Sequence, residues 1–427
     1  MIVDARAVDY GALARELTAS GILSDPWIEG RPRFATAPLV LTAERARALT
    51  TAAEALAAAW DEAARLCLAD DALVARFFPA LTPFQRLMWS ASGGAWHGIA
   101  RADVFETDDG PRVCELNCDT PSGEAEAVLL NAVVARRHPS LRDPNAGLER
   151  AFGDVVLAYA GGLDRAAAPL TVGILYPTEL VEDLSMIQLY RRWLELRGCR
   201  VVLGSPFNLA RVAHDERPAL FDVPCDLFVR HYKTDWWSER EPVRDDEPPF
   251  VDAEPLAEPL GILTAAVLAR RCAVVNPFGA VLMQNKRVMA LMWEANERFS
   301  PASQAAIRAY LPYTVRLEAL PAAALRERAD WVVKSDYGCE SAEVVIGAAV
   351  DEAVWNDALQ HAKAGRFIAQ RYFRSRVGDA EGRSVNFGVY LVGGEAAGFF
   401  SRVDRGATDY HAVTAATLVD ETGDAHG

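Results

Sequence analysis

The sequence lacks the features that would place it in a membrane or outside the cell. No apolar run approaches the length of a membrane-spanning helix, and the N-terminus has no basic start followed by an apolar stretch. The seven cysteines are odd in number, scattered, and contain no C-x-x-C pair. We therefore expect neither a disulfide framework nor a zinc site, and the predicted location is the reducing cytoplasm.

Several familiar catalytic motifs are also missing. The chain contains no Walker A sequence, no G-x-G-x-x-G, no H-E-x-x-H, no EF-hand loop and no G-x-S-x-G elbow. The seven histidines are scattered, so each is better explained as a surface or core residue than as a catalytic one. The first 80 residues hold no histidine, so an amidase domain with its own Cys/His pair is not expected.

Positive charge is in deficit. The chain has 44 Lys and Arg against 59 Asp and Glu, which gives a formal net charge of −15. Nucleic-acid binding is disfavoured, because neutralising phosphates needs clustered basic residues. A cationic partner such as a polyamine would be attracted to such a surface, although solubility alone also explains the charge.

At 427 residues, the chain is long enough for two or three packed lobes. We expect residues 1–150 to form a helical lobe with a hairpin. Residues 151–275 are predicted to form a Rossmann-like lobe, because strands alternate there with a helix. Residues 276–427 are predicted to complete the fold, which is mixed α/β (α+β).

Apolar periodicity and turn residues predict the elements of these regions. The predicted helices cover residues 42–77, 83–89, 184–197, 286–297 and 352–363. The predicted strands cover residues 99–106, 112–117, 171–176, 200–203, 226–230, 331–334, 344–346, 367–372, 385–392 and 397–403.

A β-hairpin around an Asp-Asp-Gly turn is the best-defined local structure. A three-residue loop ending in Gly110 is a known hairpin connection. In that register Asp103 faces Glu115, Arg101 faces Asn117, and alternation puts all four side chains on one face. Two carboxylates and an amide suit Mg²⁺, and an adjacent arginine suits an anionic substrate group. An exposed face covered by salt bridges would show the same pattern, so both interpretations stay open here.

The residues that follow form a longer pattern. The run from residue 101 reads R-x-D, then E-x-N-x-D-T-P-x-x-x-x-E-A, and it enters a helix whose first N–H groups could bind an anion. This pattern resembles the synthetase domain of the glutathionylspermidine synthase family. The resemblance implies that Asp103, Glu115 and Asn117 bind Mg²⁺. It also implies that Arg101 and Ser122 hold the acyl substrate.

Later segments resemble the same family in the same order. They read L-M-Q-N-K, W-V-V-K, I-A-Q-R-Y-F and a final hairpin ending in S-R-V-D. The order, with the metal motif before the lysines, is that of a circularly permuted ATP-grasp fold with a Rossmann-like pre-ATP-grasp lobe. The residues carried over are Lys286 and Lys334 for the ATP phosphates, Gly338 in the loop after the second lysine, Gln370 and Tyr372 for the adenine, and Arg402 for the reacting phosphoryl group.

The loop after Lys334 departs from the family pattern. The family loop is richer in glycine and carries a basic residue, whereas Asp336 and Glu340 add negative charge near the expected phosphates. Acids also follow the first strand of the middle region, where ligands commonly bind. There Glu182 and Asp183 could hold an ammonium group, although acids at a helix start also simply stabilise the helix.

The resemblance implies an ATP- and Mg²⁺-dependent carboxylate–amine ligase that releases ADP and forms an amide through an acyl phosphate. Its substrates would be a small-molecule or peptide carboxylate and an amine such as a polyamine. We expect no nucleic-acid or membrane partner. Two alternatives stay open: a peptide or amino-acid ligase of the same fold, and a catalytically inactive nucleotide-binding protein.

Overall fold

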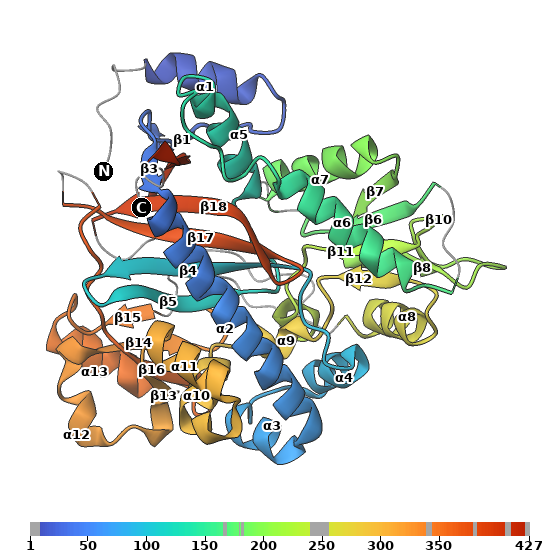
Figure 1. The fold of residues 1–427 in the computed structure, drawn as a ribbon. Coiled ribbons are helices and arrows are strands. Elements are labelled where there is room, and N and C mark those ends of the chain that lie inside the picture. The colour runs from blue at the N-terminus through green and yellow to red at the C-terminus, as the bar shows by residue number, and fades with distance from the viewer. Residues whose placement is uncertain are drawn as a thin grey trace.

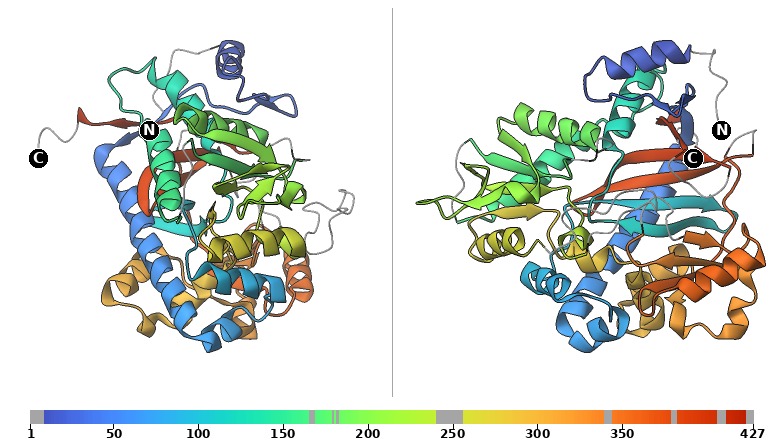
Figure 2. Two further views of the ribbon diagram at one scale, coloured as in Figure 1. Left: turned by 90° about the vertical axis from the view of Figure 1, so that its right-hand side faces the viewer. Right: turned by 180° about the vertical axis from the view of Figure 1, so that it is seen from behind.

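The structure is a computed structural model that describes residues 9–164, 169–178, 180, 183–239, 256–338, 344–378, 382–405 and 411–422. It confirms the mixed α/β class (Figure 1). Three larger sheets carry the architecture, and we call them the central, parallel and lower sheets. Figure 2 shows the same arrangement from two other sides.

The central sheet is antiparallel and joins distant parts of the chain. An early hairpin supplies β4 (Ile99–Thr107) and β5 (Gly110–Asn117), and a late hairpin supplies β17 (Ser384–Val392) and β18 (Glu395–Asp404). The strand order is β19-β18-β17-β4-β5, where β19 is Val413–Ala415. The long helix α2 (Ala43–Ala69) crosses one face of this sheet (Figure 1).

The register of the β4–β5 hairpin is as predicted, but its loop is shorter. Thr107 pairs directly with Gly110, so the turn has two residues and not three. A two-residue turn shifts the pairing by one position, and a β-bulge shifts it back. The extra residue is Cys114, since Val104 pairs with Val113 and Asp103 with Glu115.

The late hairpin turns at Gly393-Gly394, as predicted. These glycines have φ of 63° and 92°, which suits the tight turn between β17 and β18. Because β17 pairs with β4, this hairpin brings residues near 390–402 beside the polar residues of the early one.

The parallel sheet has the order β12-β11-β6-β7 and confirms the prediction of parallel strands in the middle region. Its apolar residues divide between two cores, one shared with α6 and α7 and the other with α8. Helices therefore cover both of its faces. The elements are β6 (Thr171–Leu175), β7 (Arg200–Gly204), β11 (Leu227–Arg230), β12 (Ala273–Val275), α6 (Leu148–Gly161), α7 (Leu184–Leu196) and α8 (Ala257–Leu268).

The lower sheet is antiparallel, with the order β13-β16-β14-β15, and lies below the central sheet in Figure 1. Trp331, Val333 and Trp355 are the large buried residues of its separate small core. The elements around it are β13 (Thr314–Arg316), β14 (Trp331–Ser335), β15 (Val344–Ile346), β16 (Phe367–Arg371), α10 (Arg287–Glu294), α11 (Pro301–Tyr310), α12 (Ala322–Leu325) and α13 (Glu352–His361).

Two helix predictions need correction. The helix predicted over residues 42–77 breaks at Asp70, whose extended backbone lets its side chain accept from Ala72 and Leu73 N–H and so cap α3 (Asp71–Phe77). The helix predicted to reach residue 297 ends at Glu294. The remaining elements include α1 (Tyr10–Thr18), α4 (Pro83–Ser92), α5 (Glu124–Ala135), α9 (Ala280–Met283), β1 (Trp27–Ile28), β2 (Arg31–Pro32), β3 (Leu39–Thr42), β8 (Leu209–Arg211), β9 (Pro218–Leu220), β10 (Val223–Pro224) and β20 (Thr417–Asp420).

Asn276 fastens the parallel sheet to the early hairpin. Its Oδ1 accepts from Gly98 and Ile99 N–H at 2.7 and 2.8 Å. Its Nδ2 donates to the carbonyls of Ile99, Cys118 and Asp119 at 2.8, 3.0 and 3.0 Å. One buried amide thus binds both ends of the hairpin, and the polar face keeps a fixed position relative to the parallel sheet.

Candidate active site

Four polar residues share one face of the β4–β5 hairpin, as the alternation predicts. Arg101 pairs across the hairpin with Asn117, and Asp103 pairs with Glu115. The alternate residues of β4 are small and apolar and pack into the core shared with α2. One face of the hairpin is therefore structural, and the other concentrates charge.

Asp103 lies at the centre of this charge. Its Oδ1 accepts from Arg101 Nε at 2.8 Å, and its Oδ2 accepts from Arg402 Nη2 at 2.8 Å and from Asn386 Nδ2 at 3.3 Å. Burial raises the pKa of Asp103, but the two guanidinium groups outweigh it and hold the pKa at about 2. The carboxylate stays ionised and fixes two arginines beside each other.

Glycine makes room for these arginines. Gly388 in β17 lies opposite Asp103, and a Cβ there would meet Arg101 Cδ at 2.7 Å. The ring of Phe400 lies under both guanidinium groups, each with Cζ 5.5 Å from the ring centroid. Gly123 also lies against that ring, since a Cβ there would lie 2.6 Å from Phe400 Cδ1.

Lys286, at the start of α10, faces the same hairpin. Its Nζ lies 3.7 Å from Glu115 Oε2 and donates to the carbonyl of Gly338 at 2.7 Å. The side chain of Lys286 is only 4% exposed, so its charge acts in a setting with little water. The predicted residues Lys286, Gly338 and Glu115 therefore come together.

Lys334 and Gln370 reach the hairpin from the lower sheet. Both donate to the carbonyl of Cys114, from Nζ at 3.3 Å and from Nε2 at 3.4 Å. Gln370 also donates to Thr314 Oγ1 at 3.1 Å. The carbonyl of Cys114, on the edge strand β5, thus connects the central sheet to the lower one.

Asn117 is oriented by a residue that the sequence did not single out. Gln284 Nε2 donates to Asn117 Oδ1 at 3.4 Å. Gln284 Oε1 accepts from the N–H groups of Cys118 and Asp119 at 2.7 and 3.0 Å. The loop after β5 is thus held against the α9–α10 segment.

Arg101 also reaches the start of α5. Its Nη1 donates to the carbonyl of Ser122 at 2.8 Å, and Tyr390 Oη donates to the same carbonyl at 3.1 Å. The predicted acyl-binding pair, Arg101 and Ser122, is therefore adjacent.

Three other predicted residues lie apart from this group or outside the described residues. Tyr372 follows β16, where its backbone N–H donates to Asp330 O. Asp183 precedes α7, where its Oδ1 lies 3.3 Å from His231 Nε2. Glu182 lies outside the described residues.

Asn386 and Gln284 are functional candidates that sequence reasoning missed. A signal was present for Asn386, which is a polar residue in the apolar strand S-V-N-F-G-V-Y-L-V. For Gln284 there was no such signal, because its role depends on contacts with a loop more than 160 positions away in the chain.

The negative charge predicted at Asp336 is countered by a partner. Arg366 Nε lies 3.1 Å from Asp336 Oδ2, and Arg366 Nη2 lies 2.8 Å from Glu239 Oε1. Burial raises the pKa of Asp336 to about 6, although Arg366 lowers it. Asp336 is therefore ion-paired within the described part of this loop, while Glu340 lies outside the described residues.

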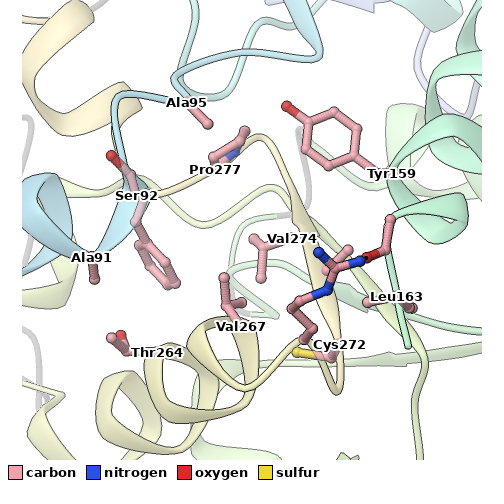
Figure 3. Close-up of a pocket in the computed structure, with 14 residues that line it drawn as sticks. Ala91, Ser92, Ala95, Tyr159, Leu163, Thr264, Val267, Cys272, Val274 and Pro277 are labelled. Atoms are coloured by element: carbon pink, nitrogen blue, oxygen red, sulfur yellow. Dashed lines mark hydrogen bonds between the residues drawn. The ribbon is translucent and has the colours of Figure 1, made fainter. Parts of the chain in front are cut away.

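A separate apolar cavity of about 170 Å³ lies between α4, α6 and α8 (Figure 3). Tyr159, Val267 and Pro277 are among its lining residues, and none of the predicted site residues lines it. The charged cluster is thus a different place in the molecule.

Across the described parts of the chain, no group of three His, Cys, Asp or Glu residues is placed to hold a metal ion. The predicted Mg²⁺ set differs in kind, since it has two carboxylates and an amide. Among the same residues, no helix is long and apolar enough to cross a membrane.

The fold and the cluster define a mixed α/β protein in which lysines and arginines from two sheets and a helix start converge on an acidic hairpin. A family model described as "Glutathionylspermidine synthase preATP-grasp" matches residues 254–418. This match confirms that the chain resembles the glutathionylspermidine synthase family.

No curated protein matches the chain. Among solved structures, a protein from Methylobacillus flagellatus KT proposed to be a gamma-glutamylcysteine synthetase is similar, with a TM-score of 0.44 and 14% identity over 87% of this chain and 85% of that one.

Proposed function

We propose that the chain is an ATP- and Mg²⁺-dependent ligase that joins a carboxylate to an amine through an acyl phosphate. The observation that carries the proposal is the convergence of Arg101, Arg402 and Lys286 on the Asp103–Glu115 pair. Fixed positive charge beside hard oxygen donors is what phosphoryl transfer needs, because its transition state spreads negative charge over the phosphoryl oxygens.

In this proposal each group has a role. Arg101 and Ser122 bind the substrate carboxylate, and Arg402 stabilises the phosphoryl group as it is transferred. The ATP phosphates are bound by Lys286, Lys334 and the Gly338 backbone, and the adenine by Gln370 and Tyr372. On binding, the phosphates would replace the carbonyl groups of Gly338 and Cys114 that the two lysines now contact.

The hairpin oxygens fit Mg²⁺. Asp103 Oδ1 accepts one hydrogen bond from Arg101 and keeps a second lone pair. Glu115 is partly exposed, with 26% of its side chain accessible, and Asn117 turns its Oδ1 toward Gln284. When bound, the ion would neutralise phosphate charge. Asp103, Glu115 and Asn117 would hold it.

The substrate pair is proposed from the family. The family's name points to a glutathione-like carboxylate and a polyamine. Asp183 and Glu182 are proposed to bind the amine. Asp183 is 25% exposed at the carboxyl end of the parallel sheet, where a cation could approach it.

ADP release from MgATP tests this proposal. Glutathione would be combined with a panel of polyamines and amino acids. We expect release only when a carboxylate and an amine are both present. Glu115→Gln should lower the rate about 100-fold or more, because a metal and phosphate contact is lost. The matched control is Asp108→Asn in the same hairpin, where the side chain is 94% exposed, and its rate should match the wild type.

The ADP-release assay, combined with calorimetry of MgATP binding, separates the alternative functions. Release with amino acids but not polyamines would identify a peptide or amino-acid ligase. Binding without release would indicate an inactive nucleotide-binding protein, and no binding would refute the ATP-grasp proposal.

A further inference from the structure

Glu124 is a buried carboxyl group whose hydrogen bonding is incomplete. It is the first residue of α5 and only 1% exposed. Its Oε1 accepts from Tyr190 Oη at 2.9 Å, while its Oε2 is buried and has no hydrogen-bond partner. A buried polar atom without a partner is costly, so native structures rarely keep one without a use.

Stabilisation of the helix start does not explain this residue. Glu126, two residues further along the same turn, ion-pairs with Arg33 at 2.5 Å and is also buried. Within the described ranges, no lysine, arginine or histidine forms an ion pair with Glu124. Tyr190, the hydrogen-bond donor to Glu124, is held in place by Phe152, and the centroids of their stacked rings lie 4.5 Å apart.

The position of Glu124 links the two proposed substrate sites. Ser122, two residues earlier, has its carbonyl held by Arg101 and Tyr390. His231 acts electrostatically on Glu124 and also contacts the partly exposed Asp183. The charged and titratable groups that act on Glu124 or its hydrogen-bond partner are Arg101 from β4, Tyr390 from β17, Tyr190 from α7 and His231 after β11.

The balance of charge makes Glu124 able to gain and lose a proton near neutral pH. Burial raises its pKa to about 7, and the opposing effects of its own backbone N–H, Tyr190, His231 and Arg101 are smaller. A general base works best with a pKa near the working pH.

We propose that Glu124 Oε2 binds the ammonium group of a primary amine substrate and takes its proton. The inference rests on the proposed ligase function. The carboxylate accepts a proton from R–NH₃⁺, which gives R–NH₂ and the neutral acid. The nitrogen lone pair then attacks the acyl phosphate carbon, the C–N bond forms, and the C–O bond to phosphate breaks. The remaining extra proton on nitrogen leaves with the phosphate.

Hydroxylamine provides the test, because it is uncharged at neutral pH and needs no proton removed before it attacks. Wild type, Glu124→Gln and the control Glu195→Gln, at a half-exposed position of α7, would each receive MgATP and glutathione, with either hydroxylamine or primary alkyl amines. We expect Glu124→Gln to form the hydroxamate at a rate close to wild type. Its turnover with alkyl amines should fall about 100-fold or more. Glu195→Gln should keep both rates within about threefold, because its ion pair with Arg191 is about half exposed.

Each outcome has a distinct meaning. If Glu124→Gln keeps full turnover with alkyl amines, the role of Glu124 is refuted while the ligase stands. If it loses both reactions and Glu195→Gln loses neither, Glu124 acts before the amine step and the inference fails. If wild type forms no hydroxamate, the ligase proposal fails, and the role of Glu124 fails with it.

Discussion

Gly388 must be glycine because its neighbour on β4 needs the space. A Cβ at Gly388 would meet Arg101 Cδ at 2.7 Å and Phe400 O at 2.9 Å. Both contacts are shorter than packed atoms tolerate, and the arginine is 7% exposed with little room to move. Arg101 can therefore lie against Asp103 only because residue 388 has no side chain.

We predict that Gly388→Ala lowers ligase turnover at least about 10-fold and destabilises the fold by about 2 kcal/mol, because Arg101 is displaced. The control is Gly261→Ala within α8, where a Cβ would have no neighbour within 4 Å. That change should stabilise the protein by up to about 1 kcal/mol. Steady-state kinetics and thermal unfolding measure both, and equal effects of the two changes would contradict the argument.

At the scale of elements, the side-chain amide of Asn276 fixes the position of the β4–β5 hairpin relative to the parallel sheet. Asn276 makes hydrogen bonds with both strand ends of the β4–β5 hairpin. Its removal leaves buried backbone groups without partners, and each such group costs free energy. The polar face would also lose its fixed distance from the parallel sheet.

Asn276→Ala should lower the free energy of unfolding by about 3 kcal/mol, measured by urea denaturation. Asn296→Ala is the control. Its amide donates to Met292 O and accepts from Arg308 in a partly exposed setting, so the loss should stay below about 1 kcal/mol. A loss below about 1 kcal/mol for Asn276→Ala would show that the Asn276 hydrogen bonds are not needed to hold the hairpin.

At the scale of the whole molecule, Arg366 connects segments that are far apart in the chain. Its guanidinium contacts Asp336 just after β14 and Glu239, which lies between β11 and β12 of the parallel sheet in the chain. Gln85 Nε2 from α4 donates to the same glutamate at 3.2 Å. One side chain thus ties the lower sheet to two other parts of the molecule.

We predict that Arg366→Ala destabilises the protein by about 3 kcal/mol at pH 8, because the Asp336 carboxylate stays buried without its partner. The folded-state pKa of Asp336 is already raised from 3.8 to about 6, so its ionisation opposes folding as pH rises through that window. Removing Arg366 raises the pKa further. The loss should therefore shrink at pH 4, where the group is largely protonated in the folded state.

The control for this prediction is Arg371→Ala. Its ion pair with Asp330 is about half exposed on both sides, at 48% and 44%, so the expected loss is below about 0.5 kcal/mol. Thermal unfolding at both pH values gives the comparison, and an Arg366→Ala loss that is the same at pH 4 and pH 8 would refute the role of Asp336.

The sequence by itself determined the local structure and the identity of the charged residues. Alternation and the Asp-Asp-Gly turn were sufficient for the pairing of Asp103 with Glu115, because strand periodicity is a property of the backbone. Adjacent glycines likewise predicted the late hairpin. The motif order predicted the family resemblance, which the match over residues 254–418 confirms.

Only the tertiary structure decided which charges meet. The bulge at Cys114, the glycine space at Gly388 and the partner of Asp336 depend on residues brought together from more than one sheet. The unpartnered oxygen of Glu124 is also invisible in a helix-start sequence, where an acid is ordinary. The sequence shows which residues are charged. The interaction energy between two charges depends on their burial and separation, and both come from the packing of distant segments.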